Sequence, residues 1–292
     1  MANSILPAEN KKDNSLIETG KFSYFLNSDV VKNKINEVIG GKDGQAFITN
    51  ICSAVANNKQ LSECENWSIV LSALQGGALK LSPQLQQYYL VPFNDKNKKH
   101  PQAQFQIGYK GFIQLAIRSG QYKNLNVVAL KDGEVISYNP LTEELQTKFI
   151  EDEEIREKKE TVGYYACFEL INGFRKSIFW SKKKMVCHAR QYSQAFKYDL
   201  AKGYTNSFWS KNFDEMAFKT LLRQLISKWG VMSVELQEAY TKDQAVIDTN
   251  GNPNYVDNQD DQNQEPKENQ QEEPKNITPE PKSEEIETFE EF

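Results

Sequence analysis

Two cations and an amide recur at helical spacing in the run 106–120. Lys110, Gln114 and Arg118 are each four residues apart, so a helix in this run places all three on one face, with Gly120 as its C-terminal cap. Cations one helical turn apart can donate hydrogen bonds to successive oxygens of an extended polyanion such as a nucleic-acid backbone. A stripe that faces only water has the same spacing, because lysine and arginine are usually exposed. The spacing alone therefore leaves both interpretations open.

A second pair of cations repeats this pattern. Apolar residues at helical spacing predict a helix over Phe213–Trp229, and Lys219 and Arg223 lie four residues apart beside its apolar face. Like charges at this spacing repel weakly, and Glu215 one turn earlier can relieve that repulsion. The pair is thus a candidate phosphate-binding site, and a salt-bridged surface helix is the alternative.

A basic loop joins two predicted strands. Tyr88–Phe93 and Gln102–Ile107 have the residue pattern of strands, and the loop between them contains Lys96, Lys98 and Lys99. We expect a β-hairpin whose positively charged tip contacts phosphate groups.

Aromatic and basic residues are interleaved between positions 190 and 211. Tyr192, Lys197 and Trp209 belong to this segment. Single-stranded nucleic acids are bound by cations along the backbone and by flat side chains against the bases, each stacked base contributing ~1–3 kcal/mol. Most aromatic side chains nevertheless lie in the core of a folded chain. The turn-rich part, Tyr198–Phe208, therefore holds the better candidates for contact with DNA or with a neighbouring subunit.

Five blocks of sequence occur in the order found in one family of recombination proteins. They are Leu74–Leu79 (LQGGAL), Tyr89–Phe93 (YLVPF), the run 106–120, Tyr192-Ser193 with the isolated Trp209, and Met216–Arg223 (MAFKTLLR). In this combination the chain resembles the RecT family of phage single-strand annealing recombinases, over roughly residues 25–234. Before Ala46 and after Tyr240 the sequence departs from the family, and the resemblance carries nothing over there.

The resemblance implies a function and a set of contacts. Proteins of this type bind single-stranded DNA without ATP and anneal it to a complementary strand, working as rings or helical filaments. The residues expected to contact DNA are Lys110, Gln114, Arg118, Lys219, Arg223, Lys96, Lys98, Lys99, Tyr192, Ser193, Lys197 and Trp209. The expected partners are single-stranded DNA, the annealed duplex intermediate and further copies of the chain. A phage exonuclease or a host single-strand binding protein is left open as a further partner.

Charge is unevenly distributed along the chain. The whole sequence has a net charge of −5, but residues 243–292 contain 15 acidic residues and 3 lysines, a net −12 that leaves +7 for residues 1–242. A moderately basic body with an acidic tail is common among nucleic-acid-binding proteins. We therefore expect a disordered N-terminus (1–21), a core for DNA binding, annealing and oligomerisation (22–242) and a disordered acidic tail (243–292).

The core is expected to combine helices with β-hairpins. Three helices are predicted between residues 22 and 81, divided at Gly40-Gly41 and near Asn57. Besides the hairpin with the basic tip, residues 125–130 should pair with 134–138, and residues 162–170 with 174–179 around Asn172-Gly173. Residues 151–160 read as a charged loop. The predicted fold class is α+β, with an antiparallel β-hairpin sheet and helices packed on one side, and the resemblance implies the same fold.

Enzymatic chemistry has little support in the sequence. It contains no Gly-x-x-x-x-Gly-Lys-Ser/Thr phosphate loop, and its four cysteines and two histidines lack the spacing of a zinc site. One alternative function is a protein that protects or loads single strands without annealing them, and another is a metal-dependent nuclease using Asp132, Glu134 and Glu169. We expect no required cofactor or metal, with modulation by magnesium left open. The lack of a long apolar run predicts no membrane segment, and the unpaired cysteines predict a reducing cytoplasm. The resemblance to a phage family implies that this is the cytoplasm of a bacterial host cell.

Overall fold

The structure is a computed structural model that describes residues 21–95 and 97–254. Its first part is helical, and α2 (Asp29–Ile39), α3 (Gly41–Ala56) and α5 (Asn66–Ala78) correspond to the three predicted helices. The short helix α4 (Lys59–Ser62) and the helical residues 21–26 were not predicted separately. Gly40 separates α2 from α3 at φ 86°, a backbone conformation that residues with a Cβ rarely adopt. Apolar side chains of these helices, among them Ile35, Ile51 and Ile69, form a hydrophobic core of their own.

The first hairpin packs against α5. β1 (Tyr88–Phe93) pairs antiparallel with β2 (Gln102–Ile107), as the sequence predicted. The Ser72 hydroxyl donates to the carbonyl of Ala103 at 2.7 Å, and the N–H of Ala103 donates to Ser68 Oγ at 2.9 Å. Because buried backbone groups need hydrogen-bond partners, these two contacts fix β2 on the helix.

Helix α6 (Tyr109–Arg118) follows β2 directly and lies against the chain that leads into β1. The N–H of Gly108 donates to the carbonyl of Gln87 at 2.9 Å. Gly111 lies so close to the same carbonyl that a Cβ at this position would overlap it. Gly120 ends the helix at φ 66°, as predicted. The glycines of this run therefore allow α6 to pack tightly beside the hairpin.

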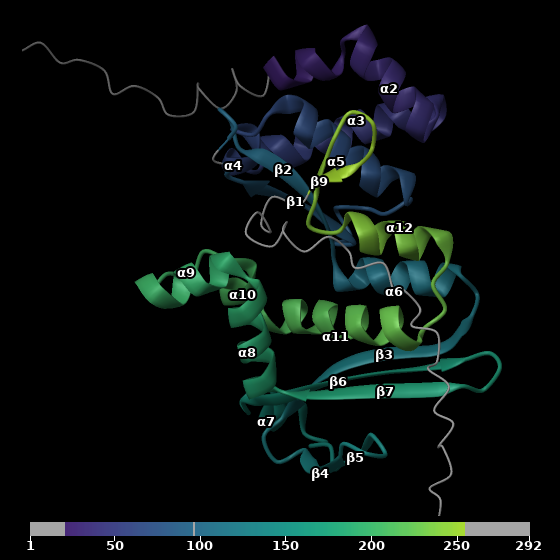
Figure 1. The fold of residues 1–292 in the computed structure, drawn as a ribbon, viewed down its shortest axis with the longest axis vertical. Coiled ribbons are helices and arrows are strands. Elements are labelled where there is room, and N and C mark those ends of the chain that lie inside the picture. The colour runs from purple at the N-terminus through teal and green to yellow at the C-terminus, as the bar shows by residue number, and fades with distance from the viewer. Residues whose placement is uncertain (1–20, 96, 255–292) are drawn as a thin grey trace, which may run out of the picture. The chain divides into compact units, whose positions relative to one another are not determined.

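The central sheet has three antiparallel strands in the order β3-β6-β7. They are β3 (Tyr122–Lys131), β6 (Thr161–Leu170) and β7 (Arg175–Ser181), and the predicted turn at Asn172-Gly173 joins β6 to β7. Figure 1 shows α11 (Phe213–Trp229) lying along this sheet, on which it packs together with α8 (Lys182–Tyr192). The bounds of α11 and of the β6–β7 hairpin confirm the predicted ones closely.

The pairing predicted between residues 125–130 and 134–138 is wrong. β3 pairs with β6 instead, and β4 (Val135–Asn139) pairs with β5 (Glu144–Thr147) in a separate hairpin. The turn at Gly133 exists, but the chain after it leaves the plane of the central sheet.

A buried ion pair between Glu134 and Arg156 stabilises the position of the β4–β5 hairpin. The Glu134 carboxylate is fully buried and accepts hydrogen bonds from the backbone N–H groups of Lys131 (2.7 Å) and Ile150 (3.3 Å). Arg156, in the short helix α7 (Glu153–Glu157), donates to it through Nε at 2.7 Å. Burial raises the pKa of Glu134, but these hydrogen bonds outweigh that effect, so its pKa lies below the usual value. The predicted charged loop thus contains a helix that anchors the β4–β5 hairpin.

The rest of the described chain is short helices and a small hairpin: α9 (Gln194–Lys202), α10 (Phe208–Lys211), α12 (Val234–Lys242), β8 (Val246–Ile247) and β9 (Pro253–Asn254). A second hydrophobic core lies between these elements, the central sheet, β2 and α6. Its fully buried members include Phe105, Leu115, Tyr164 and Leu221.

The fold class is α+β with antiparallel strands, as predicted, although the strands form several small sheets in place of one. Helices cover one face of the central sheet, which agrees with the expected arrangement. In the part of the chain that the structure describes, no helix combines the length and the apolar character needed to cross a bilayer.

The predicted start of the tail at residue 243 is too early. Asp243 and Ala245 are buried, and Ala245 forms a β-bridge with Phe105 on the edge of β2. Ile247 is also part of the second core. The predicted disordered N-terminus, apart from Lys21, and residues 255–292 of the predicted tail lie outside the described residues.

Two truncations test this boundary. A chain ending at Asn254 keeps every contact described above, so its free energy of unfolding should match that of the full chain. A chain ending at Lys242 loses Asp243, the partner of a buried lysine, and should be destabilised by about 3–5 kcal/mol. Thermal unfolding followed by circular dichroism measures both, and equal melting temperatures for the two truncations would contradict the boundary at 254.

Candidate nucleic-acid interface

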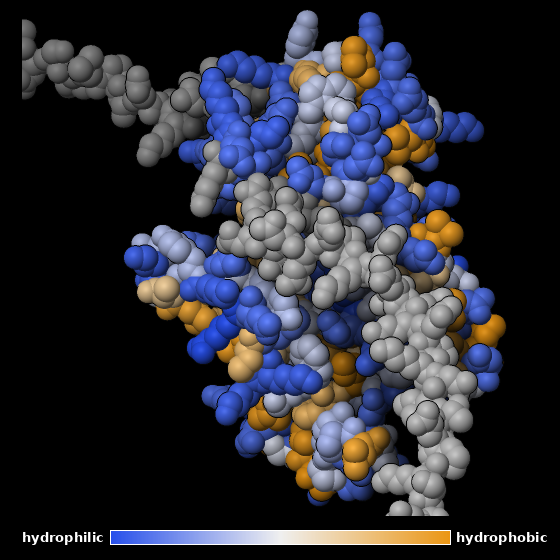
Figure 2. Space-filling model, viewed as in Figure 1, coloured by the Kyte–Doolittle hydropathy of each residue, from blue (hydrophilic) through white to orange (hydrophobic). Residues whose placement is uncertain are grey.

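A cleft lies between the β1–β2 hairpin and the helices α8 to α11. It has a volume of about 1270 Å³, and residues 90–94 border it on the hairpin side. Trp180, His188 and Tyr192 border it on the side of α8. Figure 2 shows the surface hollowed at the left of the view, between the hairpin and α9. The cleft therefore brings together residues from four of the five sequence blocks that carried the family resemblance.

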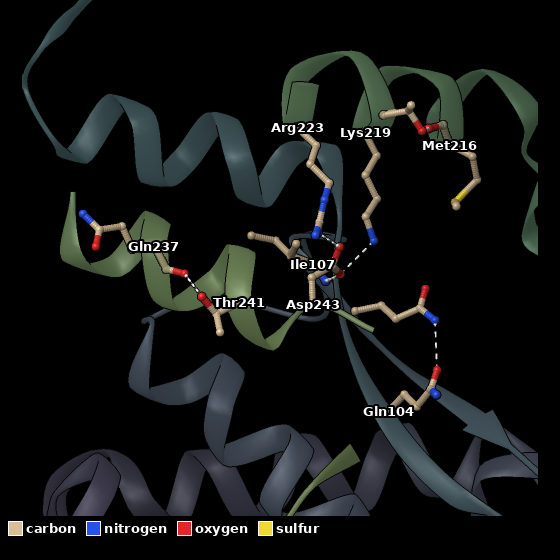
Figure 3. A network of polar contacts seen from close by, with 10 residues as sticks. Gln104, Ile107, Met216, Lys219, Arg223, Gln237, Thr241 and Asp243 are labelled. Carbon is tan, nitrogen blue, oxygen red and sulfur yellow. Dashed lines mark hydrogen bonds and ion pairs between the residues drawn. The ribbon is translucent and has the colours of Figure 1, made fainter. Parts of the chain in front are cut away.

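Two cations and one carboxylate form an ion cluster beside the cleft (Figure 3). Lys219 Nζ lies 2.8 Å from Asp243 Oδ1, and Arg223 Nη1 lies 2.6 Å from Asp243 Oδ2. The backbone N–H of Ile107 donates to Asp243 Oδ1 at 3.0 Å. Both cations line the cleft, whereas the carboxylate of Asp243 is fully buried behind them.

The surface position predicted for Lys219 is wrong. Only 5% of this residue is exposed, and its partner is Asp243, not Glu215. The cause is the segment after α12, which places the Asp243 carboxylate directly against this turn of α11. Burial lowers the pKa of Lys219, and the Asp243 carboxylate offsets part of that shift. Lys219 is therefore mainly a structural residue that neutralises a buried acid.

Arg223 differs from Lys219 in its access to the cleft. Its side chain is 29% exposed, and its guanidinium lies 3.9 Å from the centre of the Tyr240 ring. Within residues 21–95 and 97–254, Asp243 is its one hydrogen-bond partner. Because a guanidinium carries five N–H donors, several of them are free to bind a ligand in the cleft.

Aromatic rings line the α8 side of the cleft. The ring of His188 lies 5.3 Å from that of Trp180 and 4.6 Å from that of Tyr192, and Lys184 Nζ lies 4.4 Å from the Trp180 ring. Burial, together with the nearby Lys184, lowers the pKa of His188, so this ring is neutral near pH 7. Tyr192 is 68% exposed, so its ring is accessible from the solvent. The sequence singled out Tyr192 but gave no sign that Trp180 and His188 continue its surface.

The other residues predicted around Tyr192 have mixed positions. Trp209 borders the cleft but is only 7% exposed, since its ring packs 5.2 Å from that of Phe213. Ser193 caps α9 by accepting a hydrogen bond from the N–H of Phe196 at 3.2 Å. Lys197 is exposed on α9 and does not belong to the described residues that line the cleft. Trp209 and Ser193 thus have structural roles beside any contact with DNA.

The stripe on α6 forms as predicted but faces another part of the molecule. Lys110 Nζ donates to Gln86 Oε1 at 2.6 Å, and Arg118 donates through Nη1 to the carbonyl of Leu79 (2.6 Å) and through Nη2 to that of Lys80 (2.5 Å). Arg118 therefore satisfies carbonyl groups at the end of α5. Lys110, the half-buried Gln114 and Arg118 are not among the described residues of the cleft wall. The structure does not bring the two predicted pairs of cations into one site.

The basic tip of the hairpin is exposed, as expected. Lys98 and Lys99 are open to solvent and lie in the loop that follows Asn94, a residue that borders the cleft. Lys96 lies outside the described residues.

The three acids of the alternative nuclease hypothesis, Asp132, Glu134 and Glu169, do not form a metal site. Glu134 forms an ion pair with Arg156, and Glu169 forms ion pairs with Lys123 (2.7 Å) and Arg175 (3.1 Å). Asp132 lies at a turn near Lys159. Among the described residues, no group of three or more acids, histidines or cysteines is arranged to hold a metal ion.

Comparison with known proteins places the chain in a family. The sequence profile of the RecT family matches residues 45–268, which is more than half of the chain. The chain belongs to the RecT family. It is 38% identical over 216 residues to the uncharacterized protein YqaK of Bacillus subtilis (strain 168), covering 73% of this chain and 69% of YqaK. It is 30% identical over 188 residues to Protein RecT of Escherichia coli (strain K12), covering 63% of this chain and slightly less than two thirds, 65%, of that protein.

RecT family membership confirms the resemblance seen in the sequence. It supports a general role in DNA recombination by single-strand annealing, with DNA binding and oligomerisation. Several of the blocks that carried the resemblance, including β1, Gln106 at the start of the run 106–120 and the middle of α11, contribute residues to the cleft wall.

Replacing Lys219 and Lys110 separately by alanine tests the two kinds of cation. Lys219→Ala leaves the Asp243 carboxylate buried without one of its two charged partners, so we expect a loss of about 3–5 kcal/mol in the free energy of unfolding. Lys110→Ala removes a hydrogen bond at the surface and should change stability within about ±0.5 kcal/mol. Urea denaturation gives both values. Equal, small effects would mean that Lys219 is not a structural ion-pair residue.

Proposed function

We propose that the chain binds single-stranded DNA in the cleft and anneals it to a complementary strand without ATP. The observation that carries the proposal is the cleft itself, which is lined both by an accessible arginine and by exposed aromatic side chains in a member of the RecT family. Cations along the backbone and rings against the bases are the two elements that proteins use to hold single strands.

Binding in this form would be largely independent of sequence. Arg223 and Lys211 lie along the α11 and α10 side of the cleft, where they can neutralise phosphates of any sequence. Tyr192 and Tyr198, both more than half exposed, can stack on any base because every base has a flat face. Base pairing with the second strand then supplies the specificity, and the protein supplies alignment.

Several subunits acting together would strengthen this grip. Each cleft offers few cations, so a single subunit should bind weakly, and linking many clefts along one strand raises the apparent affinity. A homo-oligomer, as a ring or a helical filament, is the arrangement we propose. A phage exonuclease or a host single-strand binding protein is the further partner that we consider.

The alternative is a protein that protects or loads single strands without annealing them. The same cleft would serve this function, since protection also needs cations and rings. The two functions differ in what happens when a complementary strand arrives.

An annealing assay separates them. Two complementary oligonucleotides, one carrying a fluorophore and one a quencher, are mixed with the full chain in buffer without nucleotide. We expect faster pairing than without protein, because no phosphate loop for ATP is present. Slower pairing would indicate a protecting protein, and a requirement for ATP hydrolysis would contradict the proposal.

Salt dependence tests the role of Arg223. If its guanidinium neutralises one phosphate, Arg223→Ala should weaken binding to all sequences and reduce the magnitude of the slope of log K against log salt by ~0.7. Arg223→Lys is the matched control, since it keeps the charge and should keep most of the slope. Fluorescence anisotropy with labelled oligonucleotides measures both slopes, and an unchanged slope in Arg223→Ala would remove Arg223 from the site.

A further inference from the structure

A glutamine in the wall of the cleft has a hydrogen-bond donor with no partner. Gln104, in the middle of β2, is 1% exposed. Its Nε2 is the one buried side-chain nitrogen or oxygen atom, among residues 21–95 and 97–254, that makes no hydrogen bond. An unsatisfied buried donor costs free energy, so native proteins rarely keep one without a use for it.

The position of Gln104 points to a ligand in the cleft. Side chains alternate along a strand, and Gln104 and Gln106 both face the cleft while Phe105 and Ile107 face the core. Gln106 Nε2 donates to Gln104 Oε1 at 3.4 Å (Figure 3). This contact uses the carbonyl oxygen of the Gln104 amide, while its NH₂ group has no hydrogen-bond partner. The terminal torsion of glutamine has a broad range, so a small rotation turns Nε2 toward an oxygen in the cleft.

The charges around Gln104 favour an anionic acceptor. Arg223, with free N–H groups, lines the same cleft, as does the buried Lys219. The described lining contains one carboxylate, that of Asp199, and its Oδ2 already accepts from the N–H of Ser207 at 2.7 Å and from Ser210 Oγ at 2.6 Å. The donors left over at the cleft wall are Gln104 Nε2 and the N–H groups of Arg223 that Asp243 does not use, and an oxyanion in the cleft can accept from both.

We propose that Gln104 donates a hydrogen bond to a phosphodiester oxygen of single-stranded DNA bound in the cleft. This inference rests on the proposed function, because it assigns a further residue to the same site. It also adds a neutral contact to the charged ones, and a neutral contact fixes the strand without adding to the salt dependence of binding.

Gln104→Met tests the inference, because its structural and functional effects have opposite signs. Methionine has nearly the same length and removes an unsatisfied buried donor, so the melting temperature should be unchanged or higher. Binding of single-stranded DNA should become about tenfold weaker, the loss expected for one hydrogen bond to a charged group. The slope of log K against log salt should not change, because no ion contact is lost.

Gln102→Met is the matched control on the same strand. Gln102 is also buried, but its Nε2 donates to the carbonyl of His100 (2.9 Å) and more weakly to that of Pro101 (3.3 Å), and it does not line the cleft. This variant should melt at a lower temperature and bind DNA as tightly as the wild type when folded.

Each variant is measured by anisotropy with oligonucleotides of thymidine and of deoxycytidine, using the full chain. Equal weakening of both by Gln104→Met supports a phosphate contact. Weakening of one alone would assign the donor to a base and overturn the inference, as would unchanged affinity for both. If the wild type binds neither oligonucleotide, the proposed function itself fails, which is a separate result.

Discussion

The carboxylate of Asp243 connects three parts of the chain that are far apart in sequence. It accepts hydrogen bonds from Lys219 and Arg223 on α11 and from the backbone of Ile107 at the end of β2. A buried carboxylate is tolerated only with such partners, so α11, the β1–β2 hairpin and the segment after α12 must keep their relative positions. These same elements form two sides of the cleft. The shape of the candidate DNA site therefore depends on one buried acid.

The ion cluster also determines how much positive charge lies along the wall of the cleft. Asp243 neutralises the buried Lys219 and leaves most N–H groups of Arg223 free, so the cluster carries a net charge of +1 in place of +2. A weakly positive cleft agrees with the function we propose, in which many subunits hold the strand and then release it as duplex. Rings on α8 and the neutral amide of Gln104 can add affinity that does not depend on salt.

Local patterns in the sequence predicted the local structure well. The helix end at Gly120, the period of the helix Phe213–Trp229 and the turn Asn172-Gly173 each depend on neighbouring residues, and the structure confirms them. The strand-like residue pattern of β1 and β2, with a loop between them, likewise located the hairpin. The RecT family resemblance came from the same blocks and was confirmed by comparison with known proteins.

Contacts between distant residues could not be predicted in this way. Asp243 reads as the first acid of a polar tail, and only the folded chain shows it beside Lys219, 24 residues earlier. Glu134 likewise reads as an ordinary charge after a turn, although its partner Arg156 redirects the strand that follows. In both cases a buried acid meets its cation through tertiary structure, which the spacing of residues along one helix or strand does not reveal.

The central claim, that single-stranded DNA binds in the cleft, is tested most directly by hydrogen–deuterium exchange of the full chain with and without a saturating oligonucleotide. The account predicts slower exchange in peptides from α8, β1 and the middle of α11, with little change in the second half of α6. Protection confined to α6 and the end of α5, with none around the cleft, would contradict it and would return the DNA site to the stripe of Lys110, Gln114 and Arg118.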